Sequence, residues 1–476
     1  MADALQTLAK QHLMLHFSDM SVEAGELTVI EHGEGYYVFD TEGNRYIDGL
    51  SGLYCANLGH SHGDEIGRAA HEQMARLPFV SNWTVAHPAS IEAAARIAGL
   101  APEGLDRVFF TSGGSEAVES AWKIATQWHA ANGEPQRRKV IARRDAYHGV
   151  TMGALSLTGM PVCRTPFEPL PIPTHHVSST NSYRHPHGGE ETALCASLLA
   201  EIESAIEFER PETIAMLIAE PVQNAGGCFV PPDGYWQGLR EICDRHGILL
   251  CSDEVICAWG RIGSWFGGQR FDYVPDLITF AKGVTAGHFA FGGMLIHDKV
   301  AAPFLEGRAD YMHGYTFGGH PVGAAVALAT LDILEREGIP ERVRRNEDYA
   351  RAKLEALRDI PIVGDVRGVG HFFALELVRD QETKETLEGP VAEWLLKDVL
   401  SKRLQASGLI CRLDDRADPI VQIAPPLIGG EEMFDEIAAI LRDGLEHAAE
   451  RIDEQPPGEP VMAGRSSNPP PETPTS

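Results

Sequence analysis

The sequence predicts an α/β fold in which a large domain with a mostly parallel central sheet flanked by helices precedes a smaller α+β domain. Two observations lead to this expectation. Through the middle of the chain, short runs of β-branched and aromatic residues alternate with longer amphipathic stretches, as in successive βα units. After about residue 320 the pattern changes to long helical stretches that flank a few strands.

Six runs are expected to form the strands of the central sheet, at residues 107–111, 139–143, 214–220, 248–252, 277–281 and 292–296. Between them, residues 115–130 carry apolar side chains at helical spacing, and residues 232–246 form a second helix candidate. Apolar residues from Met433 to Leu445 predict a final amphipathic helix. Residues 452–476 are rich in proline and poor in apolar side chains, so we expect a disordered tail.

Composition narrows the possible classes of protein. The 476 residues, 43% of them hydrophobic, are enough for two or three domains. A net charge of −28 disfavours nucleic acids and anionic membranes as partners, because both are bound by clustered lysine and arginine. No apolar run is long enough to span a bilayer and the first residues do not resemble a secretion signal, so we expect a cytoplasmic protein. The eight cysteines form no C-x-x-C pair, which favours reduced thiols over disulfides or zinc ligation.

A carboxylate and an amine follow two of the predicted strands. Asp253 ends the run at 248–252, and Lys282 ends the run at 277–281. Ligands of open α/β sheets bind beyond the carboxyl ends of the strands. Lys282 is therefore placed to form a Schiff base and Asp253 to hold a pyridinium nitrogen, the two contributions that pyridoxal phosphate requires of a protein. Either residue alone could equally be a solvated turn residue.

A glycine-rich turn follows the first predicted strand. In Thr111-Ser112-Gly113-Gly114-Ser115-Glu116-Ala117, glycines free the backbone where a helix begins, and the N–H groups of a helix N-terminus attract anions. The turn is typical of a phosphate-binding loop. The alternative is that Ser115 is a helix cap supported by Glu119, and Glu116 is an unusual neighbour for a phosphate.

Further polar and aromatic residues follow other predicted strands. Tyr147 and His148 lie after the strand at 139–143, where the tyrosine ring could stack on a flat cofactor, and Glu220 ends the strand at 214–220. An exposed loop aromatic and a carboxylate that caps a turn are the alternatives. Their position at strand ends, not their identity, makes them candidates.

Two other features of the sequence suggest competing interpretations. Gly59-His60-Ser61-His62-Gly63 matches the G-x-S-x-G turn of serine hydrolases, but the residues before it, 53–58, do not resemble a β-branched central strand. Several histidines could suggest a metal site, although their proline- and glycine-rich surroundings favour loop positions and we expect no metal. These histidines are His60, His62, His175, His176, His185 and His187.

Taken together, the chain resembles a class III aminotransferase, a pyridoxal-phosphate enzyme of fold type I, from about residue 10 to residue 450. Four separated segments carry the resemblance: residues 253–261, 281–283, 313–321 and 365–370. It implies an N-terminal segment at 1–59 that packs with the small domain, a cofactor-binding domain at 60–320 and a small domain at 321–451.

The resemblance also implies roles for individual residues. Lys282 would bind pyridoxal 5′-phosphate covalently and then move the substrate proton, while Asp253 would keep the ring nitrogen protonated. Tyr147 and Val255 would flank the ring. The phosphate would be held by Gly114, Ser115 and, from a neighbouring subunit, Thr316, which implies a homodimer with shared active sites or a dimer of such dimers.

Within the family, the residue after Asp-Glu-Val is often glutamine in ornithine and gamma-aminobutyrate enzymes, whereas here it is Ile256, as in the amine:pyruvate branch. Arg412 matches the mobile arginine that binds the keto-acid carboxylate in that branch, and Arg416 is close enough in sequence to be confused with it. Pocket aromatics of the branch align with Tyr54, Trp83 and Phe17.

Three departures from the family pattern stand out. Gly113 replaces a frequent serine, Tyr54 a frequent tryptophan and Gly63 a common proline. We therefore expect a transaminase that moves an amino group from a primary amine or ω-amino acid, such as β-alanine or taurine, to pyruvate in a ping-pong cycle through pyridoxamine phosphate. The alternatives are an aminomutase or decarboxylase on the same cofactor, and a serine hydrolase built on Ser61.

Overall fold

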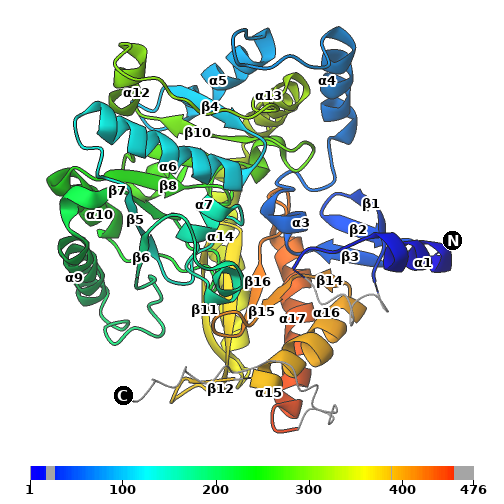
Figure 1. The fold of residues 1–476 in the computed structure, drawn as a ribbon. Helices are drawn as coiled ribbons and strands as arrows, with labels where there is room; N and C mark the ends of the chain where they lie inside the picture. Colours follow the sequence, from blue (N-terminus) through cyan, green and yellow to red (C-terminus); the bar gives the residue numbers. More distant parts are fainter. Residues whose placement is uncertain (1, 18–26, 388, 455–476) are drawn as a thin grey trace, which may run out of the picture.

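A computed structural model describes residues 2–17, 27–387 and 389–454 (Figure 1). Its centre is a seven-stranded sheet with the order β4-β10-β9-β8-β7-β5-β6. The strands are β4 (Arg107–Thr111), β5 (Lys139–Arg143), β6 (Thr174–Val177), β7 (Ile214–Ala219), β8 (Leu249–Asp253), β9 (Leu277–Phe280) and β10 (Gly292–Ile296). Strand β10 runs antiparallel to both of its neighbours, and the pairs between β9 and β6 are parallel. The predicted α/β class is confirmed.

All six predicted strands are present within one or two residues of the expected ends, but β6 was missed. The assignment of His175 and His176 to a loop was therefore wrong, because both lie in this edge strand. Thr174–Val177 has too few apolar residues to show strand periodicity, and parallel pairing with β5 supplies the order that the side chains do not reveal. His175 contacts Glu209, and His176 contacts the carbonyl of Leu157.

Helices cover both faces of the central sheet, which explains why its strands read as continuous apolar runs. Neighbouring residues of β8 alternate between the two sides. Leu249 and Cys251 belong to the core that includes α6 (Gly114–Ala131), whereas Leu250 belongs to the core that includes α9 (Glu191–Glu209) and α10 (Tyr235–His246). In Figure 1, α6 crosses the near side of the sheet. Around the β4 end lie α4 (Gly63–Arg76), α5 (Pro88–Leu100), α12 (Asp298–Leu305) and α13 (Pro321–Arg336).

Short helices connect the larger elements of this region. They are α3 (Ser51–Tyr54), α7 (Met152–Leu157), α8 (Pro161–Arg164), η1 (Thr165–Phe167), η2 (Pro211–Thr213), α11 (Gly267–Phe271) and η3 (Lys282–Thr285). Two of them matter for the site. Helix α3 is kinked, with Gly52 at a φ of 64° and Leu53 outside helical geometry. Helix η3 begins directly after β9.

The chain after α13 builds a second layer around an antiparallel sheet with the order β11-β12-β16-β15. Its strands are β11 (Val363–Val369), β12 (Phe372–Asp380), β15 (Arg412–Asp414) and β16 (Ile420–Ile423), with β13 (Glu385–Thr386) beside β12. Its helices are α14 (Ile339–Glu355), η4 (Ala356–Asp359), α15 (Gly389–Trp394), η5 (Leu395–Ser401), α16 (Lys402–Ala406) and α17 (Glu431–Arg451). The predicted final helix is α17, which buries Met433, Ile437, Leu441 and Leu445. The domain boundaries stay predictions.

The N-terminal segment joins this second layer. Helix α1 (Ala2–His12) precedes a meander of β1 (Ile30–Glu34), β2 (Tyr37–Asp40) and β3 (Arg45–Asp48). Strand β3 pairs in parallel with β14 (Leu409–Ile410), so the N-terminal segment and the C-terminal part of the chain share a sheet (Figure 1). Most of the predicted disordered tail, residues 455–476, lies outside the described residues. No helix in the described ranges is both long and apolar enough to cross a membrane.

A buried arginine ties three parts of the chain together. Arg261 has no exposed surface, and its guanidinium donates to the carbonyls of His371 and Pro425, to the hydroxyl of Ser51 and to the side-chain carbonyl of Asn57. Burial lowers the pKa of Arg261 to about 10. One side chain thus fixes the segment that carries α3 against β8 and the second layer.

We expect Arg261→Met to destabilise the protein by about 3 kcal/mol or more, because four buried acceptors lose their donor while most of the side-chain volume remains. Thermal unfolding followed by scanning fluorimetry measures the effect. Arg308→Met is the control, since Arg308 is exposed and contacts Glu306 and Asn132 at the surface. Equal melting temperatures for the two variants would contradict the role of Arg261.

Candidate active site

A cavity of about 400 Å³ lies where the carboxyl ends of β8 and β9 meet the amino end of β10. Eight of the residues predicted to bind cofactor line it. They are Gly114, Ser115, Tyr147, His148, Glu220, Asp253, Val255 and Lys282. The residues come from the ends of four strands and from the start of α6, so the sheet edge assembles what the sequence keeps far apart.

The register of β8 and β9 places the carboxylate and the amine side by side. Asp253 is the last residue of β8 and pairs with Thr279 of β9, three residues before Lys282. The Thr279 hydroxyl donates to one Asp253 oxygen at 3.0 Å, and the backbone N–H of Val255 donates to the same oxygen at 3.2 Å. The second Asp253 oxygen lies 2.7 Å from Nδ1 of His148. Asp253, only 4% exposed, is therefore held in place by three neighbours.

Lys282 begins η3 with a left-handed backbone, at a φ of 48°. Burial lowers the pKa of its ammonium below the usual 10.5. The nearby Cys55, Asp253 and Glu220 oppose this shift, and the positive charge of Arg412 adds to it. A lowered pKa increases the share of neutral amine at neutral pH, which is the form that attacks a carbonyl carbon.

The glycine-rich turn lines the cavity at the point where α6 begins. Helix α6 begins at Gly114, so Ser115 lies inside the first turn and the interpretation of Ser115 as the cap is wrong. A Cβ at Gly114 would lie 3.0 Å from the side chain of Val255, so the two chain segments are in close contact. The Ser115 hydroxyl accepts a hydrogen bond from Val150 N–H at 3.2 Å. A Cβ on Gly149, whose φ is +128°, would be 2.5 Å from that hydroxyl oxygen.

The acidic residues at and after this turn are bonded to backbone N–H groups. Glu116 accepts from the backbone N–H of Ser112 at 2.7 Å, and Glu119 accepts from Gly153 N–H at 2.8 Å. Neither carboxylate lines the cavity. Gly113 has an extended backbone, at a φ of −174°, and a Cβ there would meet nothing within 4 Å. The missing serine hydroxyl therefore leaves room that a side chain could fill.

Two buried polar atoms at the cavity wall have no hydrogen-bond partner: Nε2 of His148 and Oε1 of Glu220. Burial raises the pKa of Glu220 to about 7. Its other oxygen accepts from Asn224 N–H at 2.9 Å. Unpartnered buried polar atoms are costly, so their presence at a cavity is expected where a polar ligand binds.

The remaining predicted site residues do not line this cavity. Arg412 and Tyr54 lie beside it and contact each other, with Arg412 Nη1 donating to the Tyr54 hydroxyl at 3.1 Å. Trp83 and Phe17 are each 68% exposed, and Thr316 is exposed as well. The described chain therefore brings one group of predicted residues together and leaves these three on the surface.

Sequence reasoning missed several lining residues, among them Cys55, Phe289 and Phe291. The two phenylalanines immediately precede β10, which was expected as a strand but not as an antiparallel one. Because β10 runs antiparallel, its amino end lies at the carboxyl edge of β9 and β4, next to the site. The sequence pattern did not indicate that β10 runs antiparallel, and for this reason these lining residues were missed.

The structure does not support the hydrolase alternative. Ser61 follows a turn and the kinked helix α3, whereas a nucleophile elbow requires a strand before the serine. Of the six histidines, His60 pairs with Asp48 and His62 with Glu337, while His185 and His187 lie in turns. Across the ranges that the structure describes, no group of three or more His, Cys, Asp or Glu side chains is arranged to hold a metal ion.

The cavity residues fit pyridoxal phosphate. An amine of lowered pKa and a fixed carboxylate face one space, a helix N-terminus with a serine hydroxyl opens onto it, and Tyr147 and Val255 supply ring-sized apolar surface. The unpartnered atoms of His148 and Glu220 offer further polar contacts. Each chemical group that this cofactor needs from a protein is therefore present.

Comparison with known proteins agrees with this chemistry. The family model "Aminotransferase class-III" matches residues 20–445. A probable aminotransferase of Mycobacterium tuberculosis is 49% identical over 93% of this chain and 94% of its own length. The putrescine–pyruvate aminotransferase of Pseudomonas aeruginosa is 37% identical over 94% of this chain and 97% of its own.

A solved structure gives the same result for the fold. The (S)-enantioselective ω-transaminase of Thermomicrobium roseum superposes with a TM-score of 0.90 at 39% identity, covering 95% of this chain and 99% of the other. The predicted fold type I is confirmed. The chain belongs to the class III aminotransferases, enzymes of ω-transaminase type that depend on pyridoxal phosphate.

Proposed function

We propose that this transaminase moves an amino group from a primary amine or ω-amino acid to pyruvate, in a ping-pong cycle through the pyridoxamine form of the cofactor. The observation that carries the proposal is the pairing of Lys282, an amine of lowered pKa, with the buried Asp253 in one cavity. Pyruvate as acceptor is supported by the position of Arg412 beside the cavity and by the name of the Pseudomonas aeruginosa relative. The donor is proposed only as a class.

Asp253 and Lys282 have different roles in the proposed transamination. Bound pyridoxal phosphate supplies an electron sink that stabilises negative charge on the substrate carbon. Asp253, fixed by Thr279 and His148, would favour the protonated form of the cofactor's ring nitrogen through its negative charge. Lys282 would hold the cofactor covalently through Nζ in the resting enzyme and, as a neutral amine, would take the proton from the substrate carbon.

The start of α6 would hold the phosphate. Backbone N–H groups at Gly114 and Ser115 point along the helix axis toward the cavity, where the partial positive charge of the helix N-terminus favours an anion. The Ser115 hydroxyl adds a donor. Tyr147 and Val255 line the cavity and would flank the ring, and the unpartnered polar atoms of His148 and Glu220 would be available to bind the cofactor.

Arg412 is the better candidate for the carboxylate-binding arginine. It contacts Tyr54, and its charge is near enough to affect the pKa of both Lys282 and Tyr147. Arg416 bonds to Asp414 and lies farther along the loop. A planar guanidinium pairs with a carboxylate through two parallel hydrogen bonds, which suits the recognition of a keto acid.

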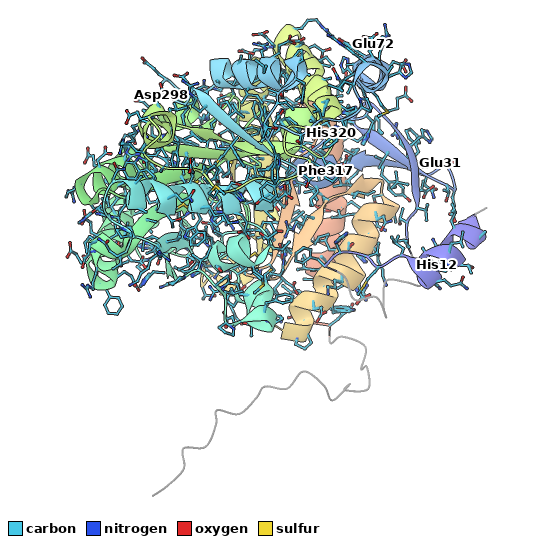
Figure 2. The ribbon with its side chains drawn as sticks, turned by 45° about the horizontal axis from the view of Figure 1, so that its top comes forward. His12, Glu31, Glu72, Asp298, Phe317 and His320 are labelled. Carbon is cyan, nitrogen blue, oxygen red and sulfur yellow. The ribbon has the colours of Figure 1, made fainter. Side chains whose placement is uncertain are left out.

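An aromatic chain runs from the cavity to the surface and supports a dimer with shared active sites. Phe289, which lines the cavity, lies 5.2 Å from the ring of His320, and His320 lies 5.5 Å from Phe79 and 6.3 Å from Phe317. Figure 2 shows Phe317 and His320 close together. Phe317 is 58% exposed, and Trp83 and Met312 are exposed in the same region. Several exposed apolar side chains beside the active site suit a second copy of the chain that supplies Thr316.

Lys282→Ala should reduce alanine formation from pyruvate and an amine roughly 10⁴-fold or more, because both covalent attachment and proton transfer are lost. Alanine and consumed amine are measured together, since one alanine per amine distinguishes transamination from an aminomutase or a decarboxylase. Borohydride reduction should attach the cofactor to Lys282 in the wild type. Lys402→Ala, at an exposed position, is the control. Normal turnover by Lys282→Ala would exclude the proposed role.

Arg412→Ala should raise the KM for pyruvate about tenfold or more, because a charge-assisted pair with the carboxylate is lost. The KM for an amine without a carboxylate should change little. Arg416→Ala is the matched comparison and should have the smaller effect on pyruvate. A larger effect of Arg416→Ala would reverse the assignment of the two arginines.

The protein should have twice the 51.9 kDa mass of the chain, or four times for a dimer of dimers, in light scattering after size exclusion. Phe317→Glu places a charge in the apolar surface, so it should yield monomers and lose activity. Phe208→Glu is the control, because Phe208 is 79% exposed at the end of α9, away from the cavity. A fully active monomer would contradict the shared site.

A further inference from the structure

The arginine beside the cavity is held by a buried carboxylate two residues further along the same strand. Arg412 and Asp414 occupy alternate positions of β15 and therefore point to the same face. Arg412 Nη2 lies 2.5 Å from Asp414 Oδ2. Asp414 is 7% exposed, and Arg416 contacts both of its oxygens, at 2.7 Å and 2.5 Å. One carboxylate thus serves two guanidinium groups.

The other side of the Arg412 guanidinium is held by a buried phenol. Its Nη1 donates to the Tyr54 hydroxyl, and that hydroxyl donates to the side-chain carbonyl of Gln422. Gln422 donates in turn to Asn224, whose backbone N–H bonds to the cavity residue Glu220. Tyr54 is 2% exposed, so this chain of hydrogen bonds is shielded from water.

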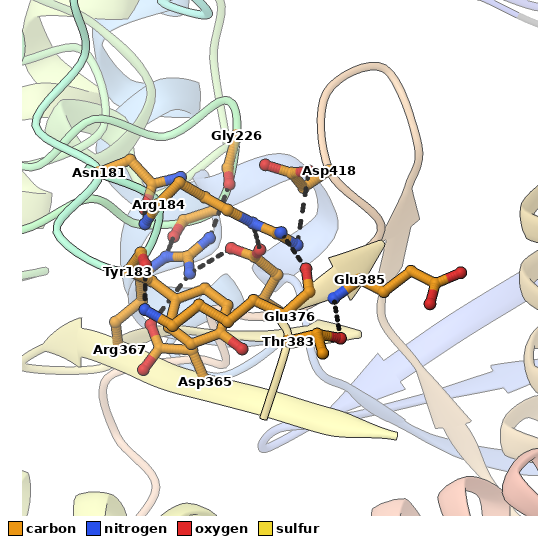
Figure 3. A network of polar contacts seen from close by, with 12 residues as sticks. Asn181, Tyr183, Arg184, Gly226, Asp365, Arg367, Glu376, Thr383, Glu385 and Asp418 are labelled. Carbon is orange, nitrogen blue, oxygen red and sulfur yellow. Dashed lines mark hydrogen bonds and ion pairs between the residues drawn. The ribbon is translucent and has the colours of Figure 1, made fainter. Parts of the chain in front are cut away.

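The loop after Asp414 is anchored at its far end as well. Asp418 lies 3.7 Å from Nη2 of Arg184, whose Nε donates to Glu376 at 2.6 Å. Glu376 also accepts from Arg367 at 2.6 Å, and Arg367 donates to the carbonyls of Gly226 and Gly227 (Figure 3). The network links the loop of Asp414 to β12 and to the loop that carries Asn224. The loop that follows Asp414 is therefore held at Arg416, through Asp414 itself, and at Asp418, through Arg184.

We propose that Asp414 is a positioning residue that holds the Arg412 guanidinium next to the cavity and so sets the preference between keto acids and substrates without a carboxylate. The inference rests on the proposed function, in which Arg412 binds the pyruvate carboxylate. Arg412 and Arg416 together exceed the single charge of Asp414, so the trio retains a positive charge that a substrate carboxylate can neutralise. A substrate without a carboxylate gains nothing from this charge.

The Arg412–Asp414 pair affects the binding free energy of keto acids differently from that of substrates without a carboxylate. A keto acid meets a guanidinium that is already ordered, so little side-chain entropy is lost on binding. An uncharged substrate that needs the space must displace the guanidinium, which breaks its bonds to both Asp414 and Tyr54. Removal of the Asp414 charge should leave the guanidinium less ordered and so weaken the binding of keto acids. It should also make it easier for an uncharged substrate to displace the guanidinium.

The test compares Asp414→Asn with Asp415→Asn in the cofactor-loaded enzyme. Asp415 is the exposed neighbour in the same loop. With one amine donor held constant, we expect Asp414→Asn to raise the KM for pyruvate roughly fivefold, with kcat within about twofold and the KM for butanal unchanged or lower. Butanal is an acceptor that lacks the carboxylate. Asp415→Asn should match the wild type with both acceptors.

The selective change in KM separates positioning from a structural role, because a folding defect would alter both acceptors alike. Equal KM values for pyruvate in the two variants, or a lower value in Asp414→Asn, would overturn the proposal. If the wild type shows no pyruvate-dependent turnover at all, the proposed function itself has failed, and that outcome is distinct from a normal wild type with an unaffected Asp414→Asn.

Tyr54→Phe provides a second variant if Asp414→Asn does not fold. It removes the other hydrogen bond to Arg412 but keeps the ring and the Asp414 pair. We expect the KM for pyruvate to rise about twofold to threefold, with butanal unaffected, because a neutral hydrogen bond contributes less than a charged one. An unchanged KM for pyruvate in this variant would contradict the two-sided hold on the guanidinium.

Discussion

The rest of the site depends on one constraint: the amine of Lys282 is buried in a cavity beside the fixed carboxylate of Asp253. Burial alone would favour the neutral amine, whereas the negative charges nearby favour the ammonium, and burial is the stronger of the two effects. The balance requires that Asp253 stay in one position. Its three hydrogen-bonding neighbours come from β9, from the turn after β8 and from the loop after β5, so the sheet itself maintains this position.

Outside the cavity, two buried arginines hold separate segments of the chain in place in a similar way. Arg261 replaces contacts with water by four oxygens from three parts of the chain, and it thereby fixes the segment that carries α3 and Cys55. Arg367 does the same between the second layer and the loop at Gly226. A guanidinium offers five donors in a rigid plane, which makes it suitable for connecting several carbonyls that no strand pairing could join.

Much of this could be predicted from the sequence, because strand ends are visible in it. The apolar runs before Asp253, Lys282, Glu220 and Ser112 located the edge of the sheet, and parallel topology then implied that these residues meet. The direction of β10 and the polar edge strand β6 could not be found this way. The local periodicity of a sequence reveals neither the direction of a strand nor the neighbour with which it pairs.

The position of Arg412 was expected only through family resemblance, and the buried partner Asp414 was not expected at all. Three acidic residues stand in or near that loop, and nothing in their order distinguishes the buried Asp414 from the exposed Asp415. The distinction comes from the strand β15, whose alternation turns Asp414 inward next to Arg412. Burial of a polar residue depends on tertiary packing and cannot be derived from one short polar segment.

The open space next to Gly113 has a consequence for the lifetime of the active enzyme. In the proposed phosphate site at the start of α6, a serine hydroxyl at this position could add a donor without strain, whereas Gly113 adds none. Whenever Lys282 is free, the coenzyme would be held by noncovalent contacts alone. We therefore expect this glycine to affect the retention of the coenzyme and not the bond-breaking chemistry.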